Sequence, residues 1–487
     1  MSPHYSDLFY ALRPEACLVL GALIALGLDI ALFRRDSLEQ RLQLALWIGA
    51  IAVVTALVTA LHEPSGRIFG GALVFDTLAV ASRVGALVLT LLTLGVVRSG
   101  KLPRHPPEHV AVILFAATGF LLMAAAQNLL LAFLAIELAS LSLYVLAGFG
   151  HSRPESIEAA LKYFLFGGMA SAFMLFGFSL IYGVTGSIDL PRVAAQVAVQ
   201  GSNPLFLVAL VMVLVGFGFK VAAAPFHLWA PDVYEGAPAP AAALIASASK
   251  LAGFTIFTRI LWLGLGAAAG RATAAPGALG WLDLVAFMAA ASLLLGNFAA
   301  LAQTNVRRLL AYSAIAHAGA LLLGVMAAGF AGPGPLFYYA ATYGIATVGA
   351  FGVVTAAERG GRCESITDLA GLYKRSPLLA VCLAVFILSL AGIPPLAGFF
   401  GKLVVFSAAL GMAGISGPAG WVTLLAIALS AVSLYYYLIV LKQALVAAPA
   451  PGAAPIRIPL ATALSLAAAA ALIVLLGLFP SLVLGFF

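Results

Sequence analysis

Long apolar runs follow one another along the whole chain, and short polar segments rich in arginine, proline and glycine separate them. A helix needs about 20 apolar residues to cross the hydrocarbon core of a bilayer. The pattern therefore predicts an all-α polytopic membrane protein with about 14 transmembrane helices. The predicted helices span residues 15–33, 42–62, 72–97, 109–126, 128–149, 158–183, 204–229, 237–266, 281–301, 309–330, 335–357, 377–409, 419–442 and 457–480. The segment 187–200 is predicted to be a short interfacial helix.

Composition agrees with this pattern, because the 487 residues are 63% hydrophobic and only 9% charged. Soluble domains usually have about 25% charged residues. Loops after odd-numbered predicted helices hold fifteen lysines and arginines, against four on the opposite side. Because basic loops stay in the cytoplasm, both termini are predicted to face outward. The net charge of +7 thus reports orientation, no nucleic-acid partner is expected, and the three cysteines have no metal-binding or redox spacing.

Basic residues inside the predicted spans are mostly lysines. These residues are Arg83, Lys162, Lys220, Lys250, Arg259 and Lys402. Arginine stays charged in a protein, whereas a buried lysine can release its proton. The bias therefore predicts proton-carrying sites at Lys220, Lys250 and Lys402. Lys162 lies near the start of its helix, where a side chain that reaches the interface is an equal alternative.

Glu137 lies in the middle of the fifth predicted helix, within the run LLLAFLAIELASLSLYVL. A lone carboxyl group inside a membrane is costly, so a basic partner is expected, and Lys220 is the best candidate. Arg83 is also mid-span, and we expect it to form a structural pair with Asp76 or Asp29, which lie near helix ends.

Two predicted helices carry prolines close to a lysine. The seventh has Lys220 followed by Pro225, and the twelfth has Pro394 and Pro395 followed by Lys402. Proline removes a backbone hydrogen bond and breaks a helix, and broken helices within a membrane line polar cavities. We therefore predict that helices 7 and 12 are broken at these prolines, and that the second break gates Lys402.

Helices 4–8 and 9–13 form two groups of five, and an odd number inverts the second group relative to the first. Lys220 and Lys402 both fall on the fourth helix of a group, and Glu137 and His317 on second helices, whereas Lys250 has no counterpart. Inverted five-helix repeats around ionisable groups are a known transporter plan. The predicted domains are an N-terminal three-helix segment at 1–108, repeats at 109–266 and 267–446, and a C-terminal transmembrane helix at 447–487.

Two histidines have different predicted roles. His317, in LLAYSAIAHAGALLL, is mid-span and is expected to relay protons, since imidazole donates and accepts near neutral pH. A hydrogen-bonded core histidine is the alternative. His227 lies near the end of the broken seventh helix, where a structural role is favoured.

Four stretches of the chain carry a family resemblance: FKVAAAPFHLWAPDVYEGAPAP, SASKLAGF, RRLLAYSAIAHAG and SLAGIPPLAGFFGK. Through about residues 110–445, the chain resembles the antiporter-like membrane subunits of proton-pumping NADH:quinone oxidoreductase, respiratory complex I. Within that group the sequence resembles subunit N. PDVYEGAP occurs together with Lys250, and Lys402 stands where subunit M has a glutamate.

The resemblance implies a role for each buried ionisable residue. Glu137 and Lys220 match the family's buried glutamate–lysine pair, Lys250 its central bridging lysine, and Lys402 its terminal lysine on the exit side. Lys162 matches a sixth-helix lysine of bacterial forms. The implied function is proton translocation coupled to electron transfer from NADH to quinone. No cofactor is expected in this chain, and the complex would use NADH, FMN, iron–sulfur clusters and a quinone such as ubiquinone in other subunits.

Other membrane subunits of complex I are the expected partners: the antiporter-like subunits L and M and the small subunits J and K, together with membrane lipid. The expected location is the bacterial inner membrane, with many passes and both termini on the periplasmic side. Two other hypotheses remain. One is a subunit of a cation/proton antiporter of the same fold, although no carboxylate-rich sodium site is obvious. The other is a structural membrane scaffold without a proton path.

Overall fold

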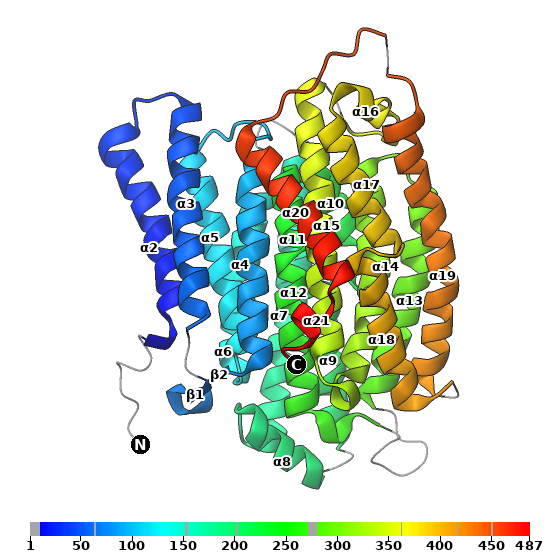
Figure 1. The fold of residues 1–487 in the computed structure, drawn as a ribbon. Helices are drawn as coiled ribbons and strands as arrows, with labels where there is room; N and C mark the ends of the chain where they lie inside the picture. Colours follow the sequence, from blue (N-terminus) through cyan, green and yellow to red (C-terminus); the bar gives the residue numbers. More distant parts are fainter. Residues whose placement is uncertain are drawn as a thin grey trace.

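Long helices stand side by side in a bundle, with short loops at its two ends (Figure 1). Most described residues are helical, which confirms the all-α prediction. A small antiparallel hairpin pairs β1 (Gly66–Ile68) with β2 (Leu73–Phe75). The computed structural model describes residues 10–62, 65–150, 154–200, 203–270, 280–361, 363–415, 417–449 and 451–487.

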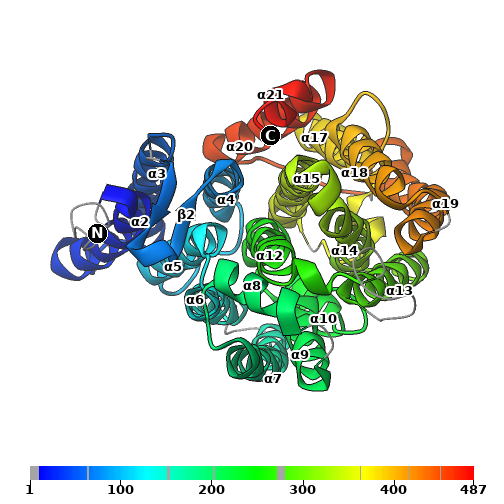
Figure 2. The ribbon, with the colours of Figure 1, turned by 90° about the horizontal axis from the view of Figure 1, so that it is seen from below.

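The first three long helices form one flank of the bundle (Figure 2). Ser37 accepts a hydrogen bond from the Gln40 N–H at the start of α3, and Asp76 accepts one from the Ala79 N–H at the start of α4. Such caps satisfy N–H groups that a helix start leaves without partners. The bounds are α2 Arg13–Leu28, η1 Asp29–Phe33, α3 Leu38–Ala60 and α4 Thr77–Val97.

The middle of the chain supplies the helices at the centre of the bundle. Asparagines cap three of them, since Asn128, Asn203 and Asn305 accept hydrogen bonds from the first N–H groups of α6, α9 and α14. The bounds are α5 Pro106–Ala125, α6 Leu129–Ala147, α7 Pro154–Thr185, α8 Leu190–Gln200, α9 Pro204–Lys220, α10 Trp229–Gly236, α11 Ala239–Ala246, α12 Ala248–Arg259, η3 Ile260–Gly264, α13 Trp281–Leu301, α14 Val306–Ala331 and α15 Gly334–Ala357.

The last part of the chain closes the bundle on the side away from α2 (Figure 2). One of its helices, α20, crosses obliquely over the bundle and packs on α4, α15 and α17 (Figure 1). The bounds are α16 Leu372–Arg375, α17 Pro377–Ala391, α18 Ala397–Ala413, α19 Pro418–Leu441, η7 Lys442–Val446, α20 Leu460–Leu478 and α21 Ser481–Leu484.

Twelve helices in the described part of the chain are long and apolar enough to cross a membrane. Two further predicted spans are each divided into shorter helices, α9 with α10 and α17 with α18. Together they agree with the predicted set of about 14 helices with breaks in the seventh and twelfth. The predicted short helix at 187–200 is α8, which lies across one end of the bundle (Figure 1).

The eighth predicted helix, 237–266, is interrupted, and the continuous helix expected from the sequence is wrong. Ser247 separates α11 from α12 with φ −116° and ψ −86°, outside the helical range. Its hydroxyl donates to the Ala243 carbonyl at 2.6 Å. This side-chain bond competes with the backbone bonds of a continuous helix.

Arg83 forms a two-bond ion pair with Glu15 of α2, at 2.7 and 2.8 Å. The predicted pairing of Arg83 with Asp76 or Asp29 is therefore wrong. Asp76 caps the helix that carries Arg83 and pairs with an arginine of α12, while Asp29 pairs with an arginine of α3. The Arg83 side chain instead connects α4 to α2.

The helices at the centre of the bundle are shielded from lipid by other helices. Figure 2 shows α12 and α14 in the middle, with α2 and α3 on one flank. The apolar window of the span Ala239–Gly264 is entirely buried inside the chain, and that of Gly334–Gly360 nearly so. Polar groups on these helices therefore face protein, where hydrogen-bond partners are available.

Candidate functional site

Three lysines each lie beside an interruption of a helix. Lys220 is the last residue of α9, before the chain turns towards α10. Lys250 lies in the first turn of α12, just after the interruption at Ser247. Lys402 lies in the second turn of α18, after the break that separates it from α17. Each interruption frees backbone groups from helical hydrogen bonds near an ammonium group.

The two proline breaks lie where the sequence predicted them, and serine hydroxyls accept hydrogen bonds from their backbone. The N–H of the residue before Pro225 donates to Ser292 Oγ of α13 at 2.8 Å. After Pro394–Pro395, the Gly398 N–H donates to Ser389 Oγ of α17 at 3.1 Å. The breaks are therefore built into the packing, and the sequence analysis did not identify either serine.

Lys220 and Glu137 are neighbours, but they do not form a direct ion pair. The buried Lys220 ammonium donates to Ser140 Oγ of α6 at 3.0 Å. Glu137 lies about one helical turn before Ser140 and accepts a hydrogen bond from the Ser171 hydroxyl of α7. Among the described residues, no ion pair of 4.0 Å or less joins the two charges. A serine hydroxyl thus receives the lysine where the sequence suggested a carboxylate.

Lys250 is 2% exposed and donates to a backbone carbonyl, that of Ala314 on α14, at 2.6 Å. Its ammonium also lies 5.7 Å from the centre of the Tyr343 ring, within range of a cation–π contact. On the same helix, a Cβ added at Gly253 would lie 3.4 Å from Lys220 Cγ. Lys220 therefore packs on α12 about one helical turn from Lys250.

His317 is hydrogen-bonded on both sides of its ring, by side chains from two other helices. Nδ1 contacts the Tyr339 hydroxyl of α15 at 2.7 Å, and Nε2 contacts the Tyr437 hydroxyl of α19 at 3.2 Å. The Tyr437 hydroxyl also contacts Ser313, about one turn before His317 on α14. Ala314, which receives Lys250, lies on this same turn. The imidazole therefore continues the series of polar groups from α12 towards the far side of the bundle.

Lys402 donates to the carbonyl of Ala391, the last residue of α17, at 2.9 Å. The lysine thus bonds to a carbonyl group at the edge of its own helix break. It also lines a cavity of about 20 Å³ together with His317, Tyr339 and Tyr436. This volume is enough for about one water molecule, and the lining supplies several polar partners for it.

These groups extend through the bundle from α6 and α9, through α12 and α14, to α18 (Figure 2). They alternate between lysines, hydroxyls, an imidazole and backbone carbonyls. Ammonium, imidazole and hydroxyl groups can donate protons, and all three can accept them once deprotonated or reoriented. The arrangement is suited to stepwise proton transfer between fixed sites.

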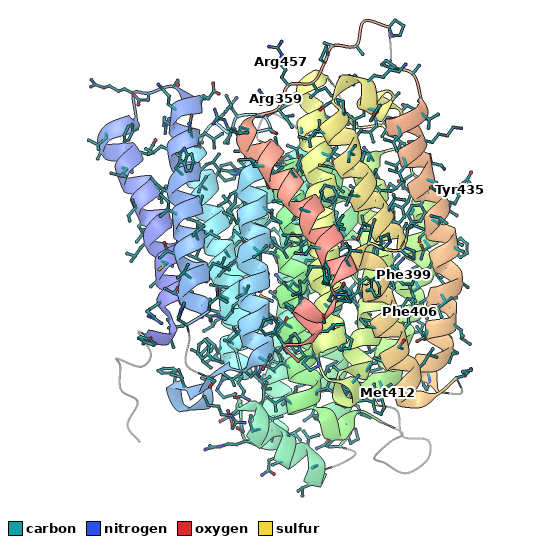
Figure 3. The ribbon with its side chains drawn as sticks, in the orientation of Figure 1. Arg359, Phe399, Phe406, Met412, Tyr435 and Arg457 are labelled. Atoms are coloured by element: carbon teal, nitrogen blue, oxygen red, sulfur yellow. The ribbon has the colours of Figure 1, made fainter. Side chains whose placement is uncertain are left out.

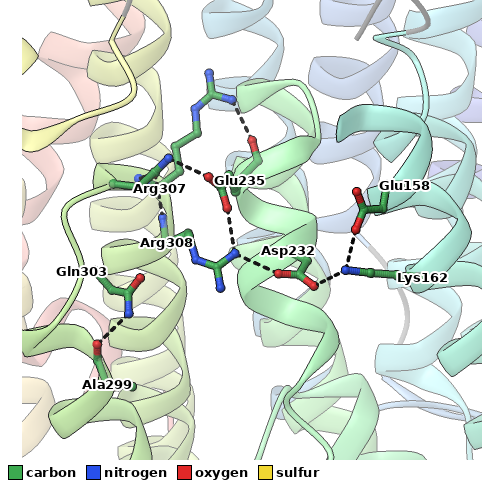
Figure 4. A network of polar contacts seen from close by, with 9 residues as sticks. Glu158, Lys162, Asp232, Glu235, Ala299, Gln303, Arg307 and Arg308 are labelled. Atoms are coloured by element: carbon green, nitrogen blue, oxygen red, sulfur yellow. Dashed lines mark hydrogen bonds and ion pairs between the residues drawn. The ribbon is translucent and has the colours of Figure 1, made fainter. Parts of the chain in front are cut away.

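Lys162 lies outside this series, in an ion network at one end of the bundle (Figure 4). Its ammonium pairs with Glu158 on its own helix at 2.7 Å and with Asp232 of α10 at 2.6 Å. Asp232 also pairs with Arg308 of α14, which pairs with Glu235, both at 2.8 Å. Burial opposes ionisation of Asp232, but the hydrogen bonds from Lys162 and Arg308 outweigh it and lower the pKa of the carboxyl group.

The same network continues through the neighbouring arginine. Arg307 pairs with Glu358 at the end of α15 and donates to the backbone carbonyl of Glu235 at 3.2 Å. Segments from both predicted repeats therefore meet in one set of charges. From the sequence, Arg307 and Arg308 were used only to predict the orientation in the membrane. The acidic residues of PDVYEGAP were the signal that opposite charges would face these arginines.

His227 lies in the turn between α9 and α10. It is buried, and its carbonyl accepts the Ala230 N–H at 2.9 Å, which supports the start of α10. Among the described residues there is no group of three or more histidines, cysteines, aspartates or glutamates that could hold a metal ion.

The fold and the site define a multi-pass membrane protein with a series of buried lysines at interrupted helices. Residues 126–434 match the family described as NADH:quinone oxidoreductase/Mrp antiporter, TM. The chain is 45% identical to NADH-quinone oxidoreductase subunit N 2 of Acidobacterium capsulatum, over 99% of this chain and 98% of the relative. It is 38% identical to subunit N of an Anaeromyxobacter species, over 91% and 88% of the two chains.

Two solved structures are similar to the chain. A chain of respiratory complex I from Thermus thermophilus, with bound aureothin, is 36% identical and matches with a TM-score of 0.78, covering 97% of this chain and 98% of that one. A chain of the Mrp complex from a Dietzia species is similar in fold, with a TM-score of 0.83 at 22% identity over 98% and 96% of the two chains. The chain belongs to the antiporter-like membrane subunit family of NADH:quinone oxidoreductase, and it is most like subunit N in that family among these matches.

Proposed function

We propose that the chain is subunit N of a bacterial NADH:quinone oxidoreductase and that it moves protons across the membrane. The observation that carries this proposal is the bonding of two buried lysines, Lys220 and Lys250, and of the partly buried Lys402 to neutral oxygens. Lys220 donates to a hydroxyl, and Lys250 and Lys402 donate to backbone carbonyls. A buried ammonium without a carboxylate partner can release its proton without leaving an unpaired negative charge.

The order of transfer follows the packing of the helices. A proton on Lys220 passes to Lys250 on the adjacent helix, then to His317, and then through a water molecule in the shared cavity to Lys402. Imidazole suits the middle position because it accepts a proton on one nitrogen and donates from the other. The Pro394–Pro395 break lets Lys402 exchange its proton with one side of the membrane.

Glu137 controls the first lysine through its charge. It lies about one turn from Ser140, the acceptor for Lys220, so a small rotation of α6 or α9 changes the distance between the two charges. The Coulomb energy of two charges varies inversely with distance and is large where water is excluded. A movement in a neighbouring subunit can therefore change the proton affinity of Lys220.

Proton transfer in this chain is coupled to redox chemistry in other subunits, which hold FMN, iron–sulfur clusters and the quinone site. The neighbours in the membrane are the subunits L, M, J and K. The chain lies in the bacterial inner membrane with both termini on the periplasmic side, because the basic loops lie at the opposite end.

The two predicted repeats, 109–266 and 267–446, supply the two halves of this proton path. Each has a broken fourth helix beside a lysine, and a serine accepts a hydrogen bond at each break. The likeness to the Mrp complex at 22% identity concerns the fold alone, whereas 45% identity to a subunit N covers nearly the whole chain. We therefore favour the complex I subunit over a cation/proton antiporter.

Lys250→Ala tests the proposal in the assembled complex. It should lower the NADH-driven proton uptake of inside-out membrane vesicles and the quinone reductase rate together, with the amount of complex unchanged. Lys442→Ala is the matched control, because Lys442 is exposed at the end of α19. Full proton uptake with Lys250→Ala would support a structural scaffold instead.

A further inference from the structure

A cavity of about 300 Å³ with mostly apolar walls opens between α3, α4 and α20, away from the lysine series. Leu46 and Trp47 of α3, Leu91 of α4 and Ala468 of α20 are among its lining residues. The Trp47 side chain is 63% exposed although it lies within a membrane-spanning helix. The cavity therefore opens to the space that lipid chains occupy around the bundle.

The cavity continues into a second, polar one of about 370 Å³, and Gln43 and Arg98 line both. Three arginines, Arg98, Arg359 and Arg457, line the polar part. One carboxylate lines it as well, that of Glu39, at 3.5 Å from Arg98. Figure 3 places Arg359 and Arg457 together at the end of the bundle where α20 begins. We call the apolar cavity the slot. It leads to a polar pocket with a net positive charge.

Two walls of the slot are fixed by hydrogen bonds between α4 and α20. Ser465 Oγ donates to the Leu92 carbonyl at 2.8 Å, and Thr462 Oγ1 donates to the Gly95 carbonyl at 2.9 Å. A Cβ added at Gly95 would lie 2.6 Å from the Ser465 Cβ, so the two backbones approach closely there. Because α4 and α20 are held together, the slot is already formed without an occupant.

We propose that this slot binds a phospholipid with an anionic headgroup. The phosphate lies against Arg98, Arg359 and Arg457, and an acyl chain lies along Trp47 and Ala468. Guanidinium groups bind phosphate through paired, charge-assisted hydrogen bonds. The arginines are at the end with the basic loops, and anionic lipids of the cytoplasmic leaflet attract such residues.

Charge favours a lipid over a protein helix as the occupant. A helix from another subunit would have to supply carboxylates to three arginines at the mouth and apolar side chains along the slot. A phospholipid supplies both within one molecule, in the orientation that the membrane already imposes. A lipid in this position braces the flank formed by α2, α3 and α4 against α20, beside the Arg98–Glu39 contact.

The test uses the intact complex in vesicles of phosphatidylcholine with a photoactivatable phosphatidylglycerol that carries its reactive group on an acyl chain. Mass spectrometry should find the label on peptides 42–50, 91–98 and 461–468. An equal amount of photoactivatable phosphatidylcholine should label them much less. In the double variant Arg98→Gln/Arg457→Gln, labelling by phosphatidylglycerol should fall by more than tenfold, since each arginine contributes about fivefold, or about 1 kcal/mol.

Arg34→Gln/Arg35→Gln is the matched control, because both arginines are exposed in the loop before α3 and line neither cavity. Labelling should be unchanged in this variant. Ala468→Phe, at an exposed position of the slot, should lower labelling while the arginines remain. Equal labelling by both lipids would overturn the proposal, as would labelling that survives the loss of Arg98 and Arg457. Absence of label from all three peptides would mean that another subunit covers the slot, and it would also overturn the proposal.

Discussion

Gly392→Ala should slow proton pumping without preventing assembly of the complex. Gly392 ends α17 in the left-handed region, with φ +86° and ψ +43°, directly after the residue whose carbonyl receives Lys402. The substitution adds a single methyl group at the Pro394–Pro395 break. It therefore tests the position of the Lys402 ammonium without removing the lysine or either proline.

The size of the effect follows from the geometry of the break. The added Cβ would lie 3.0 Å from Lys402 Cδ and 3.2 Å from its Nζ, closer than most carbon contacts, so the ammonium must move. Its 2.9 Å hydrogen bond to the Ala391 carbonyl is then weakened or lost. A hydrogen bond to a charged group contributes about 1.5–3 kcal/mol, so its loss changes the occupancy of this position by about 10- to 150-fold. The left-handed backbone costs alanine about 1–2 kcal/mol more.

The assay is NADH-driven proton uptake by inside-out vesicles, divided by the amount of assembled complex. Gly332→Ala is the matched control, because Gly332 also ends a helix with positive φ, +74°, but an added Cβ meets no atom within 4 Å. Its ψ of 173° lies outside the left-handed region, in a conformation that strains alanine at least as much, so this variant carries backbone strain without the contact to Lys402. We expect uptake several times slower in Gly392→Ala than in Gly332→Ala. Equal rates in the two variants would refute the role given to the Lys402–Ala391 contact.

Three further substitutions test other parts of the site. Lys220→Arg should abolish most proton uptake in assembled complex, because a guanidinium keeps its proton; wild-type uptake would make Lys220 a fixed counter-charge. Tyr437→Phe should slow uptake at constant assembly, since it removes a hydroxyl that contacts His317, and an unchanged rate would exclude that hydroxyl from the path. Asp232→Asn should lower the free energy of unfolding by about 0.2–1 kcal/mol for each of the two partly exposed ion pairs that it removes, and it should therefore lower the Tm of the complex. Because the pKa of Asp232 is lowered from 3.8 in the folded state, this contribution is complete above that pH and lost only as the pH falls through the lower folded value. The Tm difference should therefore stay constant from about pH 5 to 8, and a difference that shrinks in this interval would contradict the ion network.

The helices and the two proline breaks could be predicted because their signals are local. A span of about 20 apolar residues is a requirement of the bilayer itself, and the predicted helix 281–301 coincides with α13. Proline acts on the backbone of its own helix, so the breaks at Pro225 and Pro394–Pro395 follow from the sequence alone. The lysines and the glutamate within the apolar runs also indicated which positions inside the bundle would carry ionisable groups.

Pairings between helices could not be predicted, because they depend on how the helices pack. The Ser247 interruption has no proline or glycine beside it, and serine is common within transmembrane helices, so its local signal is ambiguous. Arg83 could reach several carboxylates by sequence, and only the position of α2 selects Glu15. Likewise, α6 and α9 both pack on α7, and this arrangement places Ser140 rather than Glu137 within hydrogen-bond distance of Lys220.

The four lysines within the predicted membrane spans divide into two groups according to the atoms that receive them. Lys162 is held by two carboxylates at one end of the bundle, where a proton would be released only against two ion pairs. Lys220, Lys250 and Lys402 are held by a hydroxyl and two carbonyls in the interior, each beside an interrupted helix. Only Lys402 bonds to a carbonyl at the edge of its own helix break, whereas Lys250 bonds to a carbonyl within α14 and Lys220 to a serine hydroxyl of α6. These neutral acceptors solvate an ammonium group inside the bundle without fixing its charge, which is the condition that a proton carrier must meet.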